Sequence, residues 1–295
     1  MRPGFFRRRA ALGLIGGVLV TQAASRVSGH VGTHGIGDDI DFTDPETRNH
    51  IYAQLRARTD GRPTFMPYRA TLYGKIEGQA AVPLFQVNGF SIARATKLGQ
   101  ARWRLDNVEA GYYCDLVTGE PLDRWTNPLN GRECHVQHYR SFQHLDVLPD
   151  GIAPVRQGSR PAGARFTASM GTPSLFNGQV WMHEDLIGTM PNRPKTSFAD
   201  PLEFAGPMLT ATSLATFVAS AGDVVDVRRS FVPTLLSYQT MNSWRPFMRM
   251  GETPGIIAFR LFGAKGETLK SVSKALRDRV LADYPDFLTR VEAAA

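Results

Sequence analysis

Residues 82–115 read VPLFQVNGFSIARATKLGQARWRLDNVEAGYYCD, and this stretch decides the fold. Its aromatic and branched residues fall in two short runs, 82–94 and 101–115, which show little helical periodicity. Runs of this length and composition, with glycine between them, are typical of antiparallel strands. The stretch therefore predicts two strands, and the same texture continues from Phe65 to about Ala264.

Similar runs predict further strands at 68–77, 132–140, 164–170, 174–187, 208–218, 227–241 and 256–263. Turn signals separate the runs, at Glu77-Gly78, Thr118-Gly119-Glu120, Asn130-Gly131 and Asn177-Gly178. The last of these could instead split its strand into a hairpin.

Helical signals occur only near the two ends of the chain. In Thr43-Asp44-Pro45-Glu46, Thr43 can cap a helix while Glu46 reaches back to it. Near the other end, an amphipathic helix is predicted by Leu269, Val272, Leu276 and Val280. We therefore expect a mainly β protein: an antiparallel β-barrel or strongly curved sheet, lipocalin-like or calycin-like, with N- and C-terminal helices. No internal repeat or low-complexity linker is present, so residues 45–295 are predicted to form one domain.

Several predicted strands carry a row in which polar and aromatic side chains share one face. The rows are Gln86, Asn88, Phe90, Ile92 and Arg94 in 82–94, Glu109 and Tyr113 in 101–115, and Asn177, Gln179, Trp181, His183 and Asp185 in 174–187. Such mixed rows suit a ligand-holding barrel, because polar groups orient a ligand that apolar groups desolvate. The alternative is that these faces point to water, as one face of many antiparallel sheets does.

The N-terminus has the order of a secretory signal peptide. Arg7, Arg8 and Arg9 precede an apolar run, residues 10–20, and small residues follow. We predict a signal peptide at 1–24, with the twin-arginine route or an ordinary export signal as alternatives, then a flexible arm at 25–44. The expected location is periplasmic or secreted.

The bulk composition describes an ordinary globular protein, with 42% apolar and 21% charged residues. Removing the predicted signal would lower the formal charge from +7 to +3, because it takes four arginines with it. We therefore expect no nucleic-acid partner, and no stable membrane insertion once the signal is gone. The expected partner is a small hydrophobic or aromatic ligand, with a homodimer as an open alternative. Cys114 and Cys134 could form a disulfide or stay as buried thiols.

Common catalytic signatures are missing from the sequence. It contains no phosphate loop, dinucleotide turn, nucleophile elbow or HExxH zinc helix. His135 and His138 are three apart, so on a strand they face opposite sides and cannot share a metal. His183 and Asp185 do share a face and could pair as base and orienter, although a surface histidine beside acids is commoner. We expect no metal and no cofactor.

Two groups of residues resemble the bacterial DUF1838 family. The first comprises Pro83-Leu84-Phe85, Gly89–Arg94, Glu109, Tyr113, Asp115, Thr118–Leu122, Trp125, Asn127-Pro128 and Gly131, and the second comprises Ser243–Gly251 with Pro254-Gly255. The resemblance covers roughly residues 45–290 and implies a shared architecture, since the family's function is unassigned. This chain departs from the pattern at Phe247, where a second tryptophan is usual. It departs again at 139–142, where Tyr-Arg-Ser-Phe replaces an asparagine-rich stretch, which puts any polar site around His138 in doubt.

The candidate site combines acid–base groups with aromatic and basic residues. The predicted catalytic residues are Arg94, Glu109, Tyr113 and His138, and the predicted substrate-binding residues are Trp181, His183, Trp244, Arg245 and Phe247. Glu109 and Tyr113 project into one space, which suits Glu109 for proton abstraction, and Arg94 could stabilise an enolate. The structural alternatives are a Glu109–Arg94 pair that stabilises the sheet and a core plug formed by the 244–250 segment.

The leading functional hypothesis is a cofactor-independent lyase or isomerase that uses acid–base chemistry on a small hydrophobic oxygenated substrate, aromatic or terpenoid-like, in a barrel pocket. The main alternative is an exported, non-catalytic small-molecule-binding protein of lipocalin-like build. A metal-dependent enzyme is a third hypothesis.

Overall fold

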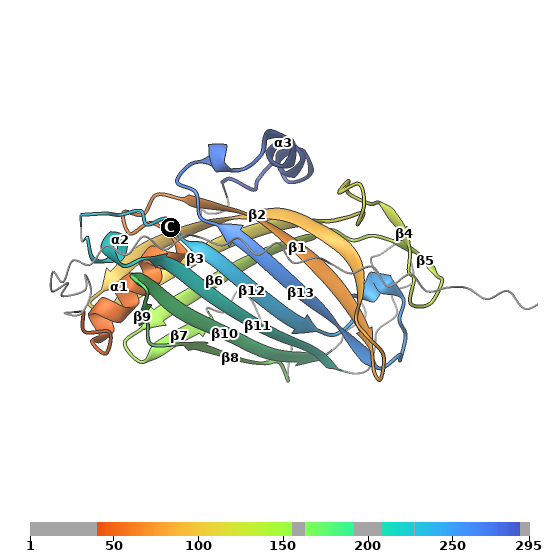
Figure 1. The fold of residues 1–295 in the computed structure, drawn as a ribbon, viewed down its shortest axis with the longest axis horizontal. Helices are drawn as coiled ribbons and strands as arrows, with labels where there is room; N and C mark the ends of the chain where they lie inside the picture. The colour runs from red at the N-terminus through yellow and green to blue at the C-terminus, as the bar shows by residue number, and fades with distance from the viewer. Residues whose placement is uncertain (1–39, 155–162, 192–207, 227, 290–295) are drawn as a thin grey trace, which may run out of the picture. The chain divides into compact units, whose positions relative to one another are not determined.

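The computed structural model describes residues 40–154, 163–191, 208–226 and 228–289. In these residues, ten strands form an antiparallel sheet that curls into a nearly closed barrel (Figure 1). Helix α1 (Pro45–Arg56) precedes the strands and helix α3 (Lys274–Asp283) follows them. The predicted mainly β barrel with N- and C-terminal helices is confirmed.

The strands follow one another around the barrel in an order that is not their order along the chain. That order is β7 (Gly151–Pro154), β6 (Tyr139–Leu148), β3 (Arg102–Cys114), β2 (Val82–Gly99), β1 (Thr64–Ile76), β13 (Gly255–Ala264), β12 (Leu235–Asn242), β11 (Met208–Ser220), β10 (Gln179–Pro191) and β8 (Arg165–Met170). A short strand, β9 (Ser174–Phe176), also pairs with β10. At the seam β7 and β8 lie close together, but no ladder joins them among the described residues.

Alternation along each strand determines which side chains point into the barrel. The register places Met66 of β1 opposite Ser91 of β2, and Ser91 opposite Glu109 of β3. All three residues line one interior cavity. The inner face is therefore made of even-numbered residues on β1 and odd-numbered residues on β2 and β3.

Apolar clusters close the two ends of the barrel. At one end, Ile51, Tyr52 and Leu55 of α1 pack against inner-face residues such as Trp103 and Phe217. At the other end, Trp244 and the 3₁₀ helix η1 (Pro246–Met248) pack against inner-face residues of β1, β2, β3 and β13. A hairpin of β4 (Arg124–Thr126) and β5 (Glu133–His135) supports this second plug. Its Asn127 side chain is fully buried and donates from Nδ2 to the Met248 carbonyl at 2.7 Å.

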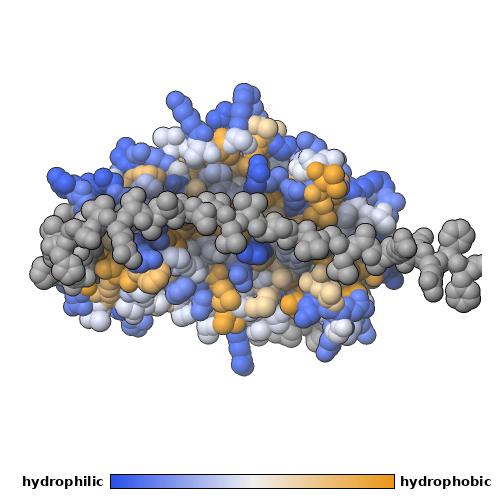
Figure 2. Space-filling model, in the orientation of Figure 1, coloured by the Kyte–Doolittle hydropathy of each residue, from blue (hydrophilic) through white to orange (hydrophobic). Residues whose placement is uncertain are grey.

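Helix α3 covers part of the barrel's outer face. Val280 and Phe287 pack on the outward row of β2 and β3, which includes Phe90, Val108 and Ala110. Before it, η2 (Leu269–Ser271) follows β13. A short helix, α2 (Ala221–Val225), lies between β11 and β12. On the side drawn in Figure 2, hydrophobic and hydrophilic residues are interspersed outside the grey atoms, as is usual for protein surfaces.

Two local predictions were wrong at the first helix. Asp44, not Thr43, is the N-cap, and its carboxylate accepts from the Thr47 amide at 2.9 Å. Glu46 does not reach back to Thr43; it accepts from the backbone amide of Ala101 and from Lys97. A tertiary contact with β2 and the β2–β3 turn thus replaces the local capping box.

Strand boundaries also differ from the prediction in the middle of the chain. The strand predicted at 132–140 is split, with β5 ending at His135 and β6 beginning at Tyr139. Asn177 and Gly178 both have positive φ and separate β9 from β10, so the hairpin alternative is correct. The strand predicted at 227–241 begins only at Leu235.

The predicted signal peptide (1–24) and most of the predicted arm (25–44) lie outside the described residues. Cys114 and Cys134 are both buried, and the structure forms no disulfide between them, in line with the second alternative left open by the sequence. Among the described helices, none has the length and apolar character needed to cross a bilayer.

Candidate functional site

A polar layer lies inside the barrel between the two apolar plugs. It surrounds a cavity of about 80 Å³ whose lining includes Glu109, Tyr68, Tyr238, Arg56 and Glu184. These five residues come from β3, β1, β12, α1 and β10, so the layer draws on elements all around the barrel. Ionisable groups held together in a mostly apolar interior are a frequent feature of functional sites.

Glu109 is the centre of one half of this layer. Its Oε1 accepts from the Tyr139 hydroxyl at 3.3 Å, and its Oε2 accepts from the Ser141 hydroxyl at 3.2 Å. The Tyr139 hydroxyl lies 2.5 Å from that of Tyr68. Each phenol has one proton, so when Tyr139 donates to Glu109 it can accept from Tyr68. This arrangement allows a directional chain from Tyr68 to Tyr139 to Glu109, and the Tyr68 hydroxyl has the Ala110 carbonyl, at 3.3 Å, as a second acceptor.

Two glycines make room for this chain. Gly111 lies opposite Tyr139 in the ladder, and a Cβ at Gly111 would lie 2.4 Å from the Tyr139 ring. Gly89 lies opposite Tyr68, and a Cβ there would lie 2.3 Å from the Tyr68 hydroxyl. Because larger residues at these positions would displace the rings, both glycines determine where the phenols sit.

The environment keeps the two phenols protonated. Burial, reinforced by the Glu109 carboxylate, holds the pKa of Tyr68 well above its usual value. The pKa of Tyr139 is raised well above its usual value by the same two causes. Both hydroxyls therefore act as hydrogen-bond donors at neutral pH.

The other half of the layer is centred on Glu184, which is 3% exposed. The Tyr52 hydroxyl donates to Glu184 Oε2, and Arg56 Nε lies 3.5 Å from the same oxygen. Burial alone would lower the pKa of Arg56, but Glu184, together with Tyr52, Tyr238 and Glu109, more than offsets this and the pKa is raised. The guanidinium also lies 5.3 Å from the centre of the Phe217 ring. Arg56 therefore stays charged and is neutralised by Glu184.

A second guanidinium approaches from the opposite plug. The pKa of Arg245 is raised, chiefly by Tyr113, with smaller contributions from Tyr139 and Tyr238. Its Nε is buried without a hydrogen-bond partner. In the described part of the chain no carboxylate forms an ion pair with Arg245, in contrast to Arg56.

Comparisons with known proteins identify the family. Residues 61–294 match the family described as "Protein of unknown function (DUF1838)". The chain belongs to the DUF1838 family. No curated protein sequence matches it. Among solved structures, Ail, the attachment invasion locus protein of Yersinia pestis, is similar at 6% identity and a TM-score of 0.25. The match covers 70% of this chain and 99% of that one, and a likeness at this level supports no conclusion about function.

Two of the four predicted catalytic residues of this DUF1838 chain point into the barrel. Glu109 lines the cavity, and Tyr113 lies on the same face of β3, where its ring packs against Phe85 and Phe247 at 5.2 and 5.4 Å between ring centres. Both side chains lie on the inner face of β3, but only Glu109 lines the cavity, whereas Tyr113 belongs to the apolar plug.

Arg94 does not join them. It lies opposite Asp106, on the outward face of β2 and β3, and its Nε donates to the Gly61 carbonyl at 2.6 Å. The predicted inward position was wrong, and so was the alternative of a Glu109–Arg94 pair, because the two residues are on opposite faces of the sheet.

His138 immediately precedes β6, and its ring forms a hydrogen bond with the backbone. Its Nδ1 accepts from the Tyr113 amide at 3.2 Å, and its ring packs edge-on against Tyr112 at 4.8 Å between ring centres. Burial lowers its pKa, so the ring is neutral at pH 7. No contact links His138 to Glu109, which separates it from the polar layer.

The predicted substrate-binding residues fall into two groups. Trp181 and His183 lie on the outward face of β10, where His183 bonds to Thr216 at 3.1 Å, so their predicted lumen position was wrong. Trp244 and Phe247 belong to the buried plug, and Trp244 Nε1 donates to the Thr253 carbonyl at 2.9 Å. Only Arg245 of this set approaches the polar layer. The core-plug alternative describes Trp244 and Phe247 well.

Sequence analysis missed seven residues of the layer: Tyr52, Arg56, Tyr68, Tyr139, Ser141, Glu184 and Tyr238. Tyr139 and Ser141 alternate with Arg140 and Phe142, and this alternation indicates a strand. The predicted strand ended at residue 140, so the alternation was not recognised. In the described residues no group of three or more His, Cys, Asp or Glu side chains could hold a metal ion.

Proposed function

We propose that this DUF1838 protein is a cofactor-independent lyase or isomerase that carries out acid–base chemistry at Glu109 inside the barrel. The observation that supports the proposal is a half-buried carboxylate that lines a cavity inside the barrel, with no ion-pair partner in the described chain and with two protonated phenols next to it. A carboxylate that is not neutralised by a cation is available as a base.

In the proposed reaction, Glu109 removes a proton from a carbon next to a carbonyl. The C–H electron pair moves toward the carbonyl oxygen, and an enolate forms as the Glu109 oxygen takes the proton. The Tyr139 hydroxyl then donates its hydrogen bond to the enolate oxygen instead of to Glu109, which stabilises the negative charge. Tyr68 in turn donates to Tyr139 and keeps that phenol in position.

The reaction can finish in two ways. In an isomerase, Glu109 returns the proton to a different carbon. In a lyase, a leaving group departs from the β-carbon with the electron pair and takes up the proton. Neither route requires an oxidant, a reductant or a metal.

The cavity favours a compact substrate. Its volume of about 80 Å³ is well below the 300–1,000 Å³ typical of pockets for drug-sized ligands. A small oxygenated molecule of a few non-hydrogen atoms fits this space better than the terpenoid-like ligands expected from the sequence. Arg56 and Arg245 lie on either side of the layer, which favours a substrate that develops negative charge.

The experiment compares wild type with Glu109→Gln. Pure protein is incubated with a library of small keto and hydroxy compounds, and product masses are measured. Glu109→Gln keeps the shape but cannot take the proton, so we expect turnover to fall by at least about a hundredfold with ligand affinity nearly unchanged. Glu120→Gln, in the turn at 118–120 after β3, is the matched control and should leave turnover intact.

Two results would count against the proposal. Turnover that survives Glu109→Gln would show that another group is the base. Ligands that bind but return unchanged would support the alternative, a non-catalytic small-molecule-binding protein.

We also propose that the chain is exported, because the order of basic, apolar and small residues in 1–24 is that of a signal peptide. Fractionation of a bacterium that expresses the full chain tests this. Replacing Arg8 and Arg9 with lysine should block export if the twin-arginine route is used.

A further inference from the structure

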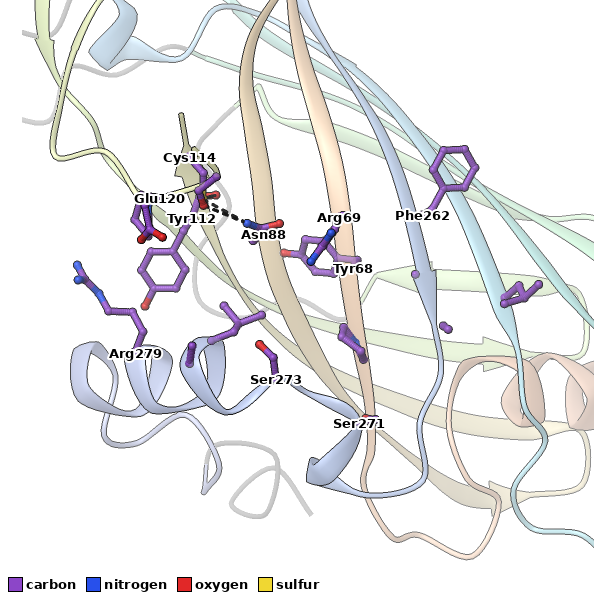
Figure 3. A pocket seen from close by; sticks show the side chains of 18 residues that line it. Tyr68, Arg69, Asn88, Tyr112, Cys114, Glu120, Phe262, Ser271, Ser273 and Arg279 are labelled. Atoms are coloured by element: carbon purple, nitrogen blue, oxygen red, sulfur yellow. Dashed lines mark hydrogen bonds between the residues drawn. The ribbon is translucent and has the colours of Figure 1, made fainter. Parts of the chain in front are cut away.

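A second, larger hollow lies on the outside of the barrel. It is a groove of about 830 Å³ between the beginning of α3, the turn at 119–121 and the outer faces of β1, β2, β3 and β13 (Figure 3). That volume is typical of small-molecule sites. Arg69, Asn88 and Phe262 line the groove and not the interior cavity, while Tyr68 borders both hollows.

The floor of the groove is a single row of side chains across four strands. Tyr112 of β3 lies opposite Asn88 of β2, Asn88 lies opposite Arg69 of β1, and Arg69 lies opposite Phe262 of β13. Directly opposed residues in an antiparallel sheet have Cβ atoms about 5 Å apart. The row therefore presents a phenol, an amide, a guanidinium and a phenyl ring side by side.

Arg69 is the available cation of this row. It is exposed, and it forms no ion pair in the described part of the chain. The other arginine of the groove, Arg279, is held by Asp283, with its Nε 2.8 Å from the carboxylate. Glu120, the groove's carboxylate, lies on the Arg279 side and away from Phe262 (Figure 3). An anion would thus meet Arg69 without competition from a built-in partner.

Apolar surface flanks this cation. Phe262 is 54% exposed, which is unusual for a phenyl ring on a sheet face. Pro67 and Leu276 line the groove with it, and Leu276 reaches in from α3. An exposed aromatic side chain in a concave site next to an unpaired guanidinium is the arrangement that binds a flat apolar molecule carrying an anionic group.

We propose that this groove is a binding site for a small organic anion with an aromatic body. Its carboxylate or sulfonate pairs with Arg69, and its ring lies against Phe262 and Leu276. This site does not depend on chemistry at Glu109, since Arg69 and its neighbours face outward.

The test uses two fluorescent probes that share an aromatic body. Anilinonaphthalene sulfonate carries an anionic group, and phenylnaphthylamine does not. Both are titrated into the full chain, and we expect the sulfonate to bind more tightly. Arg69→Gln should weaken binding of the sulfonate by about three- to fivefold, the range for an exposed ion pair. It should leave the affinity for the neutral probe unchanged. Arg69→Lys should retain most of the sulfonate's affinity.

Matched variants make the result specific. Lys75→Gln removes a positive charge from the same outward row of β1 beyond the groove. It should change the affinity for neither probe. Phe262→Ser should weaken the binding of both probes. The proposal is overturned if Arg69→Gln behaves like wild type, if Lys75→Gln weakens the sulfonate equally, or if both probes bind unchanged to Phe262→Ser.

Discussion

Strands β3 and β10 both alternate a mixed polar row with a mainly apolar row, yet they turn these rows in opposite directions. On β3 the mixed row with Glu109 faces inward, and the apolar row with Val108 and Ala110 faces outward. On β10 the mixed row with His183 faces outward, and the row with Met182 faces inward.

The difference arises from what covers the outside of each strand. Helix α3 packs on the outer face of β3, so an apolar row there is buried against Val280 and Phe287. The described residues place no helix over the outer face of β10, where Ile187 is 50% exposed. Alternation shows which residues share a face, but a covering element decides which face an apolar row can occupy.

The largest expected effect separates the two faces of β10. Glu184→Gln removes the carboxylate that neutralises Arg56 and leaves that guanidinium buried without an anionic partner. We expect it to lower the free energy of unfolding by about 4 kcal/mol. Urea denaturation followed by circular dichroism measures the loss.

The neighbouring Asp185→Ala is the control, because Asp185 faces outward on the same strand and should cost less than about 0.5 kcal/mol. Equal losses in the two variants would show that the inward carboxylate has no special role.

The second prediction concerns the cover over β3. Phe287 is fully buried with its ring 5.1 Å from that of Phe90, so Phe287→Ala leaves a cavity beneath α3. We expect the free energy of unfolding to fall by about 3 kcal/mol and amide exchange in α3 to become faster. Phe176→Ala on β9, where the ring is 64% exposed, should cost less than about 0.5 kcal/mol. Protection of α3 that matches wild type would contradict its role as the cover.

The third prediction tests the packing of the inner face of β3. A methyl group at Gly111 would overlap the Tyr139 ring, at 2.4 Å, so Gly111→Ala must shift that phenol away from Glu109. We expect the free energy of unfolding to fall by about 2 kcal/mol, which thermal unfolding measures. Gly99→Ala, at the end of β2 with no atom within 4 Å of the new carbon, should be neutral. A neutral Gly111→Ala would mean that Tyr139 has room to move.

The fold class was predictable because strand and helix signals are local. The runs at 82–94 and 101–115 became β2 and β3, and a helix is present near each end as expected. The C-terminal helix is shorter than predicted, because α3 begins at Lys274 and leaves Leu269 and Val272 outside it. The inward positions of Glu109 and Tyr113 were also anticipated. The reversed row on β10 and the outward Arg94 were not, because neither depends on local sequence.

The missing residues of the polar layer have a similar cause. Tyr68 is brought to Tyr139 by pairing around the barrel, across 71 residues of sequence. Arg56 reaches Glu184 only because α1 closes the barrel end. Such contacts depend on strand order, which a single sequence does not reveal.

The smallest expected effect concerns the half-buried His138 beside β3. Burial lowers the pKa of His138 in the folded protein below its usual value of 6.5, so the folded state binds fewer protons than the unfolded state. Stability from this group is therefore complete above the unfolded pKa and falls as the pH drops through 6.5 toward the lower folded value. His138→Gln should flatten the stability profile between pH 7 and pH 5. Because His50 is shifted in the same direction by burial, some slope should remain in His138→Gln. Denaturation midpoints at closely spaced pH values measure the profiles of wild type and His138→Gln, and an unchanged slope in His138→Gln would mean that burial does not lower the pKa of this ring.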